Sequence, residues 1–360
     1  MEGQQLDEET GINNSRLELL SSLLGQEIAL EIQSNNTIDD HRTTICSHPV
    51  FLRYTCTKCD QEINGTISTI PFWYIYPDLN LSFNEINRIR DTNLQRLLSR
   101  RKLHLVIDLD HTLVHTRKKY KLSPEDRDFV RTKRYGIDYN LPGELGALLF
   151  QAGGSWTKLR PYVRDFLREA STMFDMTIYT LGCKFYAWSM SKLLDSNGRY
   201  FDNWRVVSRD DCVMLDKHKK FLDVVLEHER VVVVMDDNED VWEDHKTNLL
   251  KITPYNYFSY FSPEDKVHDA SPPRLSWSQL NEDESEENGV LARALDKLRL
   301  VHAAFFDGLS ANGVEDYGDR DVRQVLQRVL VKEKSLTKKQ KKQKAKKISD
   351  LSRALQAAHL

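Results

Sequence analysis

The stretch HLVIDLDHTLVHT, residues 104–116, places two carboxylates one residue apart directly after an apolar run. Asp108 and Asp110 would repel each other at the end of a buried strand. A second acidic pair, Asp236 and Asp237, follows the apolar run RVVVVM. A hard divalent cation relieves such repulsion, and Mg²⁺ prefers carboxylate oxygens. The four aspartates therefore predict a Mg²⁺ site, although each acidic pair alone is typical of a solvated turn or a helix cap.

Further polar residues follow the other predicted strands, namely Thr112, Thr180, Arg209, Lys219 and Lys220. In a parallel sheet the carboxyl ends of the strands meet at one edge, where ligands bind. Hydroxyl and ammonium groups beside a divalent cation suit a phosphate ligand. A carboxylate can act as the nucleophile, and a second carboxyl, kept protonated by its ionised neighbour, can supply a proton. The pattern indicates phosphoryl transfer in which one aspartate attacks and the other protonates the leaving group.

The elements that would position these residues can be read from the hydrophobic pattern. Apolar, β-rich runs recur as LHLVID, MTIYTL, WRVVS, RVVVVMDD and LLKI. Helical patterns lie between most of them, as VRDFLREASTMF, CKFYAWSMSKLLDSNG and HKKFLDVVLEHE. Such alternation predicts an α/β fold, with a parallel sheet covered by helices on both faces. Residues 117–155 interrupt the alternation and are expected to form an insertion after the first catalytic strand.

The remaining organisation follows from composition along the 360 residues. We expect Ser82 to cap a helix, with Glu85 completing a capping box. The expected segments are a polar, mostly disordered leader at 1–42, a small Cys/His element at 43–66, a helix at 82–101, the catalytic domain at 102–265, a solvated acidic linker at 266–290, a helical segment at 291–331 and a basic tail at 332–360.

The Cys/His element carries a possible second metal site, formed by Cys46, His48, Cys56 and Cys59. Three sulfurs and one imidazole are adequate for tetrahedral Zn²⁺. The alternative is a small docked loop with free thiols. The isolated Cys183 and Cys212 are predicted to be packing residues.

Composition limits the setting in which the protein works. Hydrophobic residues make up 40% and charged residues 29% of the chain, as expected of a globular core with polar tails. No apolar run approaches the length of about 20 residues that spans a bilayer, and five unevenly spaced cysteines are unlike a secreted disulfide framework. A cytosolic or nuclear protein is therefore expected. The lysine-rich residues 332–347 could be a nuclear import signal, a nucleic-acid contact or a solubilising tail.

The surrounding sequence resembles a known family. The signature DLDHT is similar to the D-x-D-x-T motif of the haloacid dehalogenase superfamily. The segments RRKLHLVIDLDHTLVHT, WTKLRPYVRDFLREASTMFDMTIYTLG, YAWSMSKLLDSNGRYF and VVVVMDDNEDVWEDHKTNLLKI resemble the transcription-factor-IIF-associating phosphatases that act on the C-terminal domain of RNA polymerase II, the plant-type members above all. The resemblance covers roughly residues 46–262 and implies a haloacid-dehalogenase-like fold.

The resemblance also implies residue roles. Asp108 would be the nucleophile that forms an aspartyl phosphate. Asp110 would protonate the serine leaving group, activate water, and contact the metal through its backbone carbonyl. The other implied roles are metal binding by Asp108 and Asp237 with Asp236 in support, phosphate binding by Thr180 and Lys220, orientation of the substrate or its surroundings by Thr112 and Arg209, a structural role for Arg160, and packing of Trp242 beside the metal-bearing loop.

The resemblance implies a Mg²⁺-dependent (or Mn²⁺-dependent) protein serine/threonine phosphatase in the nucleus. Its partners would be the phosphorylated RNA polymerase II C-terminal domain and the transcription machinery, without a membrane or direct nucleic-acid binding. The phosphopeptide-reading BRCT module of many relatives is not expected in this sequence. Two alternatives stay open: a phosphatase for a small metabolite, and a non-catalytic scaffold that binds phosphoproteins.

Overall fold

The fold is described from a computed structural model. It describes residues 46–62, 68–132, 149–152, 154–201, 205–212, 216, 218–259, 276–280, 282–307, 320–333 and 335. The predicted leader at 1–42 and nearly all of the basic tail at 332–360 lie outside the described residues. Within the described part of the chain, every helix is too short or too polar to cross a membrane.

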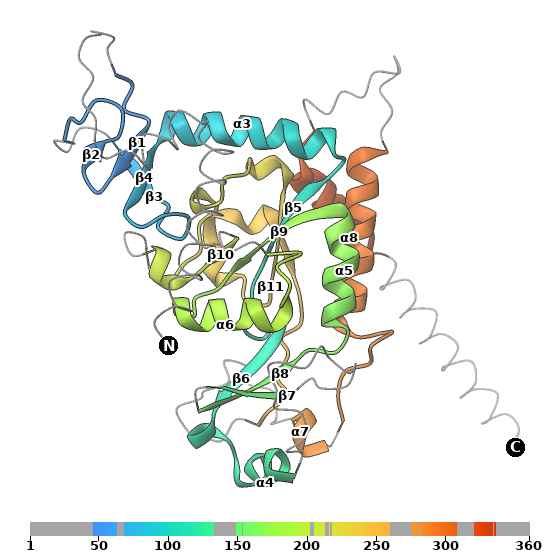
Figure 1. The fold of residues 1–360 in the computed structure, drawn as a ribbon. Helices are drawn as coiled ribbons and strands as arrows, with labels where there is room; N and C mark the ends of the chain where they lie inside the picture. The colour runs from blue at the N-terminus through green and yellow to red at the C-terminus, as the bar shows by residue number, and fades with distance from the viewer. Residues whose placement is uncertain are drawn as a thin grey trace, which may run out of the picture.

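A five-stranded parallel sheet forms the centre of the molecule, in the order β10-β9-β5-β11-β12 (Figure 1). Its strands are β5 (Leu103–Ile107), β9 (Phe174–Tyr179), β10 (Val206–Val207), β11 (Val232–Asp236) and β12 (Leu249–Lys251). Every residue of β5, β9 and β11 is buried, because helices or loops cover both faces of the sheet. The predicted α/β fold with a parallel sheet is confirmed.

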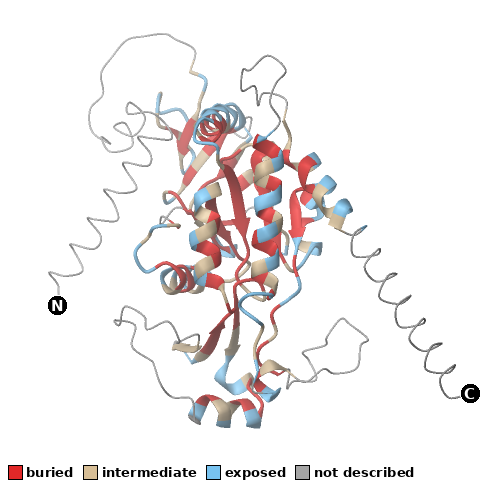
Figure 2. Cartoon of the chain, turned by 90° about the vertical axis from the view of Figure 1, so that its right-hand side faces the viewer, coloured by how far each residue is buried: buried red, intermediate tan, exposed pale blue. Residues whose placement is uncertain are grey.

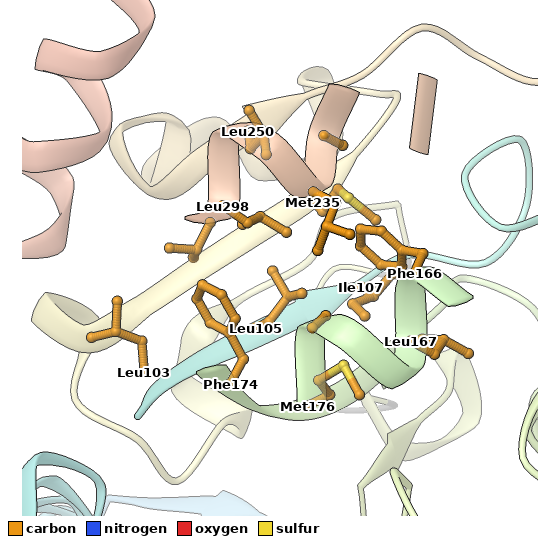
Figure 3. Packing of buried hydrophobic residues seen from close by; sticks show 14 of the residues in the cluster. Leu103, Leu105, Ile107, Phe166, Leu167, Phe174, Met176, Met235, Leu250 and Leu298 are labelled. Atoms are coloured by element: carbon orange, nitrogen blue, oxygen red, sulfur yellow. The ribbon is translucent and has the colours of Figure 1, made fainter. Parts of the chain in front are cut away.

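The alternation of side chains along the strands divides the core in two. Leu105 and Ile107 of β5 pack with the helices α5 (Val163–Met173) and α8 (Val290–Phe306) in one cluster (Figure 3). Val106 and Val234 point to the other face and belong to a second cluster. Figure 2 shows the central strands buried and the outer sides of the neighbouring helices exposed.

The opposite face is covered differently from the sequence prediction. The prediction of a helix at HKKFLDVVLEHE is wrong. The described residues of this segment form only the short 3₁₀ turns η3 (Leu222–Val224) and η4 (Glu229–Val231). Side chains of the preceding helix α3 (Phe83–Ser99) donate hydrogen bonds to backbone carbonyls of this segment. The Leu222 carbonyl also accepts from the Val225 amide in a 3₁₀ turn. Tertiary contacts therefore replace the helical hydrogen bonds. The helix α6 (Lys184–Leu194) forms as predicted.

The insertion after β5 forms a three-stranded antiparallel sheet in the order β6-β8-β7. It consists of β6 (Val114–Lys118), β7 (Leu149–Ala152) and β8 (Ser155–Leu159), with η1 (Lys119–Lys121) and α4 (Pro124–Thr132) between β6 and β7. The predicted insertion is thus present. Its sheet already begins at Val114, because β6 continues directly from the turn that follows β5.

A second antiparallel sheet precedes the parallel sheet in the chain, in the order β2-β1-β4-β3. Its strands are β1 (Val50–Leu52), β2 (Thr55–Cys56), β3 (Thr69–Pro71) and β4 (Leu79–Ser82), so the sheet extends past the Cys/His element expected at 43–66. The hydroxyl of Ser82 accepts a hydrogen bond from the Glu85 amide at 3.4 Å and caps α3, as predicted. The Glu85 carboxylate pairs with Arg88 and does not close the capping box.

The segment after the parallel sheet also departs from expectation. Two further turns, η2 (Arg209–Cys212) and η5 (Asp240–Asn248), flank the sheet, and α7 (Trp277–Leu280) lies against the insertion. The acidic stretch from residue 282, expected to be part of a solvated linker, is docked through Asp283 and Glu284, which pair with basic residues of β8 and the turn after it. Residues 322–333 are helical and add to the core beside α8.

Candidate active site

Three aspartates meet where β5 and β11 end side by side. The two strands pair in parallel, and the Asp108 amide donates to the Met235 carbonyl at 3.0 Å. This register brings one carboxylate oxygen each from Asp108, Asp236 and Asp237 within 4.8 Å of one another. The structure therefore brings together the acidic residues of two strands that the sequence predicted to converge.

Lys220 lies between two of these aspartates. Its Nζ donates to Asp108 at 2.6 Å and to Asp236 at 2.7 Å, and all three side chains are buried. The ammonium group also lies over the rings of Tyr179 and Trp242, at 5.7 and 5.6 Å from their centroids. Lys219, by contrast, forms a surface pair with Glu243. Lys220 therefore lies within the acidic cluster, and Lys219 lies at the surface.

Asp236, the last residue of β11, and Asp237 directly after it differ in how many hydrogen bonds their carboxylates accept. Asp236 accepts from Lys220, from Nε1 of Trp242 at 2.8 Å and from the Asn238 amide at 2.8 Å. Asp237 is half-buried and accepts a long contact of 3.5 Å from the Thr112 hydroxyl. Asp236 thus fixes the lysine and the loop, whereas Asp237 presents its carboxylate beside Asp108.

Asp110 is held by a residue that the sequence prediction missed. The hydroxyl of Tyr186, in the first turn of α6, donates to Asp110 at 2.6 Å. The same hydroxyl lies 2.9 Å from the Thr116 hydroxyl of β6. Thr180 lies near Asp110 as well, and its hydroxyl accepts from the Gly182 amide at 3.0 Å. A polar aromatic residue at the start of a helix that begins at the carboxyl edge of the sheet was the available signal for Tyr186.

Burial governs the electrostatics of these groups. It raises the pKa of Asp108 well above the ordinary value, as does the Asp236 charge, while Lys220 opposes the rise. Burial also raises the pKa of Asp110, and the hydrogen bond from Tyr186 opposes it. Burial raises the pKa of Tyr186, so this hydroxyl stays neutral and acts as a donor. The pKa of Asp237 is raised too, mainly by burial and by the Asp236 charge.

A buried arginine supports the turn that carries the first aspartates. Nη1 of Arg160 donates to the carbonyls of His111 and Thr112 at 3.3 and 3.1 Å. The guanidinium, which is fully buried, also makes a two-fold hydrogen-bonded pair with Glu284 at 2.8 and 3.0 Å. A buried charge needs such pairing. The partner of Arg160 is therefore Glu284. The sequence had predicted Glu284 to lie in the solvated acidic linker.

Arg209 and the isolated cysteines have simpler surroundings. The Arg209 guanidinium is about half exposed, with the Asp210 carboxylate at 4.0 Å, so among the described residues the structure does not join it to the acidic cluster. Cys212 is buried and contacts the Tyr179 hydroxyl, in line with a packing role. Cys183 is exposed, so its prediction as a packing residue is wrong: it precedes α6 at the surface.

Among the residues that the structure describes, two groups of side chains could hold a metal ion. The carboxylates of Asp108, Asp236 and Asp237 are hard oxygen donors of the kind that Mg²⁺ binds, so these residues fit a divalent cation. The second group, formed by Cys46, His48, Cys56 and Cys59, offers soft ligands and lies in the N-terminal antiparallel sheet.

A parallel sheet with paired aspartates after one central strand, a second acidic pair after its neighbour and a buried lysine between them defines a protein of the haloacid dehalogenase superfamily. Within that class, the family described as NLI interacting factor-like phosphatase matches residues 103–280, and the chain belongs to this family. The family implies a divalent metal.

Individual relatives are similar over different shares of their length. The chain is 40% identical over 285 residues to RNA polymerase II C-terminal domain phosphatase-like 4 of Arabidopsis thaliana, and the match covers 79% of this chain and 61% of the relative. It is 34% identical over 247 residues to RNA polymerase II C-terminal domain phosphatase-like 3 of the same plant, where the match covers 67% of this chain and 19% of the relative. The chain thus spans less than two thirds of these relatives.

A solved structure is also similar. The structure of Fcp1, described as an essential RNA polymerase II CTD phosphatase, has 22% sequence identity and a TM-score of 0.47, and the match covers 66% of this chain and 73% of that chain.

Proposed function

We propose that the protein is a Mg²⁺-dependent protein serine/threonine phosphatase that acts on the C-terminal domain of RNA polymerase II through an aspartyl phosphate. One observation carries the reaction type: the buried Asp108 carboxylate contacts Lys220 at 2.6 Å and faces Asp237. The substrate is supported by the names of the relatives, which are described as phosphatases of that domain or as similar to them.

The chemical steps follow from the positions of the two aspartates. The Asp108 carboxylate attacks the phosphorus of phosphoserine, and the bond to the serine oxygen breaks as Asp110 gives that oxygen a proton. Asp110 then takes a proton from water, which attacks the aspartyl phosphate and releases phosphate. Tyr186, at 2.6 Å, stabilises the Asp110 carboxylate between these steps.

The remaining side chains of the site neutralise the negative charge of the phosphate and the aspartates, and they orient these groups. Lys220 offsets the charge of Asp108 and of the phosphate, and Thr180 adds a hydroxyl near Asp110. Asp108 and Asp237 would hold Mg²⁺ with the Asp110 carbonyl, while Asp236 keeps Lys220 in place. When bound, Mg²⁺ supplies positive charge for the phosphate oxygens. Thr112 contacts Asp237 and orients it. A second metal ion, Zn²⁺, is proposed for the group formed by Cys46, His48, Cys56 and Cys59, because its soft ligands suit zinc.

The test is turnover of phosphoserine peptides of the polymerase repeat, with and without Mg²⁺. Asp108→Asn should abolish turnover and leave the fold intact, because an amide cannot form the acyl phosphate. Beryllium fluoride with Mg²⁺ should inhibit the wild type by mimicking the aspartyl phosphate. Near wild-type turnover by Asp108→Asn would refute the nucleophile assignment. Hydrolysis of a sugar phosphate but not of the peptides would favour the metabolite phosphatase, and binding without turnover would favour the scaffold.

We infer a nuclear location from the proposed substrate and from the lysine-rich residues 332–347. Basic runs of this kind act as nuclear import signals. A reporter fused to these residues should enter the nucleus, and a uniformly distributed reporter would contradict the inference.

A further inference from the structure

Four side chains converge at one end of the N-terminal antiparallel sheet. Cys46 and His48 precede β1, and Cys56 and Cys59 come from β2 and the turn after it. The ligand atoms, three Sγ and one imidazole nitrogen, all lie within 4.8 Å of one another. Cys56 is buried and the other three are half-buried. Two short chain segments thus present a closed set of four metal-binding side chains.

The distances within this set fit a tetrahedral metal better than a disulfide. The Sγ atoms of Cys46 and Cys56 are 3.8 Å apart, and Cys59 Sγ is 3.4 Å from Nδ1 of His48. A tetrahedral Zn²⁺ with Zn–S bonds of about 2.3 Å and Zn–N bonds of about 2.0–2.1 Å separates two sulfurs by about 3.8 Å and a sulfur from a nitrogen by about 3.5 Å. A disulfide requires a sulfur separation of about 2.05 Å.

Two backbone amides point at sulfur atoms of this set. The His48 amide donates to Cys46 Sγ and the Lys58 amide donates to Cys56 Sγ, both at 3.4 Å. Hydrogen bonds to sulfur favour its charged form. Two non-glycine residues at or next to the ligands, His48 and Asp60, have left-handed φ values of 45° and 56°. This backbone conformation is costly and persists where surrounding contacts impose it.

The strands that carry the ligands are too short to hold this arrangement alone. β1 has three residues and β2 has two, and an isolated hairpin of that size is at best marginally stable in water. β1 pairs with β4, which leads directly into α3. A metal that joins the start of β1 to the end of the hairpin would therefore fix the whole sheet at its free end (Figure 1).

This sheet and α3 support the segment that follows Lys220. The hydroxyl of Tyr74 donates to the Val224 carbonyl at 2.6 Å, and Asn93 donates to the Leu226 carbonyl at 2.8 Å. Arg90 donates to the carbonyls of Leu222 and Val225 at 3.0 and 3.2 Å. These contacts replace the helix that the sequence predicted, so the segment depends on its neighbours for its shape.

The same neighbours share one apolar core. Val50 of β1 and Leu81 of β4 belong to the buried cluster that also contains Leu222, Val224 and Trp242. Trp242 in turn donates to Asp236 and lies beside Lys220. A continuous path of packed side chains and hydrogen bonds thus runs from the cysteine hairpin to the acidic site.

We propose that Cys46, His48, Cys56 and Cys59 bind one structural Zn²⁺, and that this ion holds the N-terminal sheet against the segment that carries Lys220. Zn²⁺ is the metal of choice because a closed set of three thiolates and one imidazole, without a free position, is typical of structural zinc. The proposal does not depend on the reaction proposed above, since it concerns metal content and local stability.

The first experiment measures metal in the full chain purified after growth with added zinc. The wild type should contain about one zinc per chain, held by four ligands. Cys59→Ser should lose it, whereas the matched control Cys183→Ser, which alters an exposed cysteine outside the cluster, should keep it. If Cys59→Ser fails to fold, Co²⁺ replaces Zn²⁺ in the wild type, and sulfur-to-cobalt charge-transfer absorption is expected. A zinc-free wild type, a zinc-loaded Cys59→Ser or the absence of that absorption would overturn the proposal.

The second experiment measures hydrogen exchange with Mg²⁺ present throughout. Removal of zinc by a chelator should accelerate exchange of the amides at 222–226 by tenfold or more, roughly the effect of losing 1.4 kcal/mol of local stability. The amides of β9, in the centre of the parallel sheet, serve as the control and should not change. Equal exchange at 222–226 with and without zinc would show that the ion does not support the Lys220 segment.

Discussion

Lys220 and Lys219 are adjacent lysines in opposite surroundings, and replacing each by methionine separates a buried charge from a surface one. Lys220 is buried and lies 2.6 and 2.7 Å from two buried carboxylates. Its replacement leaves Asp108 and Asp236 without their shared cation. Breaking a buried ion pair by removing one partner costs about 3–5 kcal/mol. Methionine keeps most of the volume, so Lys220→Met should lower the free energy of unfolding by that amount in the absence of metal.

The control variant Lys219→Met should behave differently, because water screens the charge of Lys219 at the surface. Lys219 pairs with Glu243 at the surface, and such pairs contribute about 0–1 kcal/mol. Lys219→Met should therefore change the free energy of unfolding by less than about 1 kcal/mol and leave turnover unchanged. Urea unfolding of both variants, followed by tryptophan fluorescence at low and high Mg²⁺, measures the difference.

Turnover separates the structural from the chemical role of the lysine. Excess Mg²⁺ should restore part of the stability of Lys220→Met, because a cation among the three aspartates again reduces their repulsion. It should not restore phosphopeptide turnover, because the phosphate still lacks its ammonium partner. Full recovery of turnover by Mg²⁺, or equal destabilisation by Lys219→Met, would refute this account of Lys220.

Two further variants test other contacts of the site. Tyr186→Phe removes the hydrogen bond that opposes the raised pKa of Asp110. The pKa of Asp110 should therefore rise further, and the alkaline limb of kcat/KM, where Asp110 loses its proton, should move to higher pH. Turnover should fall about tenfold or more. An alkaline limb at the wild-type pH would contradict the role of Asp110 as the general acid. Glu284→Gln leaves the buried Arg160 charge unpaired and should cost about 3–5 kcal/mol in urea unfolding, whereas the exposed control Glu286→Gln should cost little; equal losses would contradict the role of the pair.

The sequence was sufficient for the elements whose stability comes from their own hydrophobic pattern. β5 and β11 are short, mostly apolar runs rich in β-branched residues, and such runs between helical patterns favour the central strands of a covered parallel sheet. β9 is less uniform, because it carries Asp175 and Thr177 among its apolar residues. The convergence of Asp108 with Asp237 followed from the rule that parallel strands end at one edge. These predictions needed no knowledge of side-chain contacts.

The features that could not be predicted depend on contacts between distant segments. Residues 218–229 have a helical pattern, but Arg90 and Asn93 donate hydrogen bonds to the carbonyls of Leu222 and Leu226, which a helix would use. Glu284 is one acid in a run of acids, and only the buried Arg160 distinguishes it from its solvated neighbours. The predicted start of α6 marks Tyr186 as a candidate, but its hydrogen bonds to Asp110 and Thr116 depend on how α6 packs against the end of β5 and against β6.

The positions of Glu284 and α8 determine where a shortened form of this protein can end and still fold. The family match ends at residue 280, yet Leu298 of α8 packs in the same cluster as Phe166 of α5 and Leu105 of β5. Leu326, still later in the chain, belongs to that cluster as well. A fragment ended at 280 would have an uncovered apolar face and an uncompensated guanidinium under its catalytic turn. The smallest independently folding unit therefore extends to about residue 330, and expression boundaries, chimaeras and domain swaps should respect that limit.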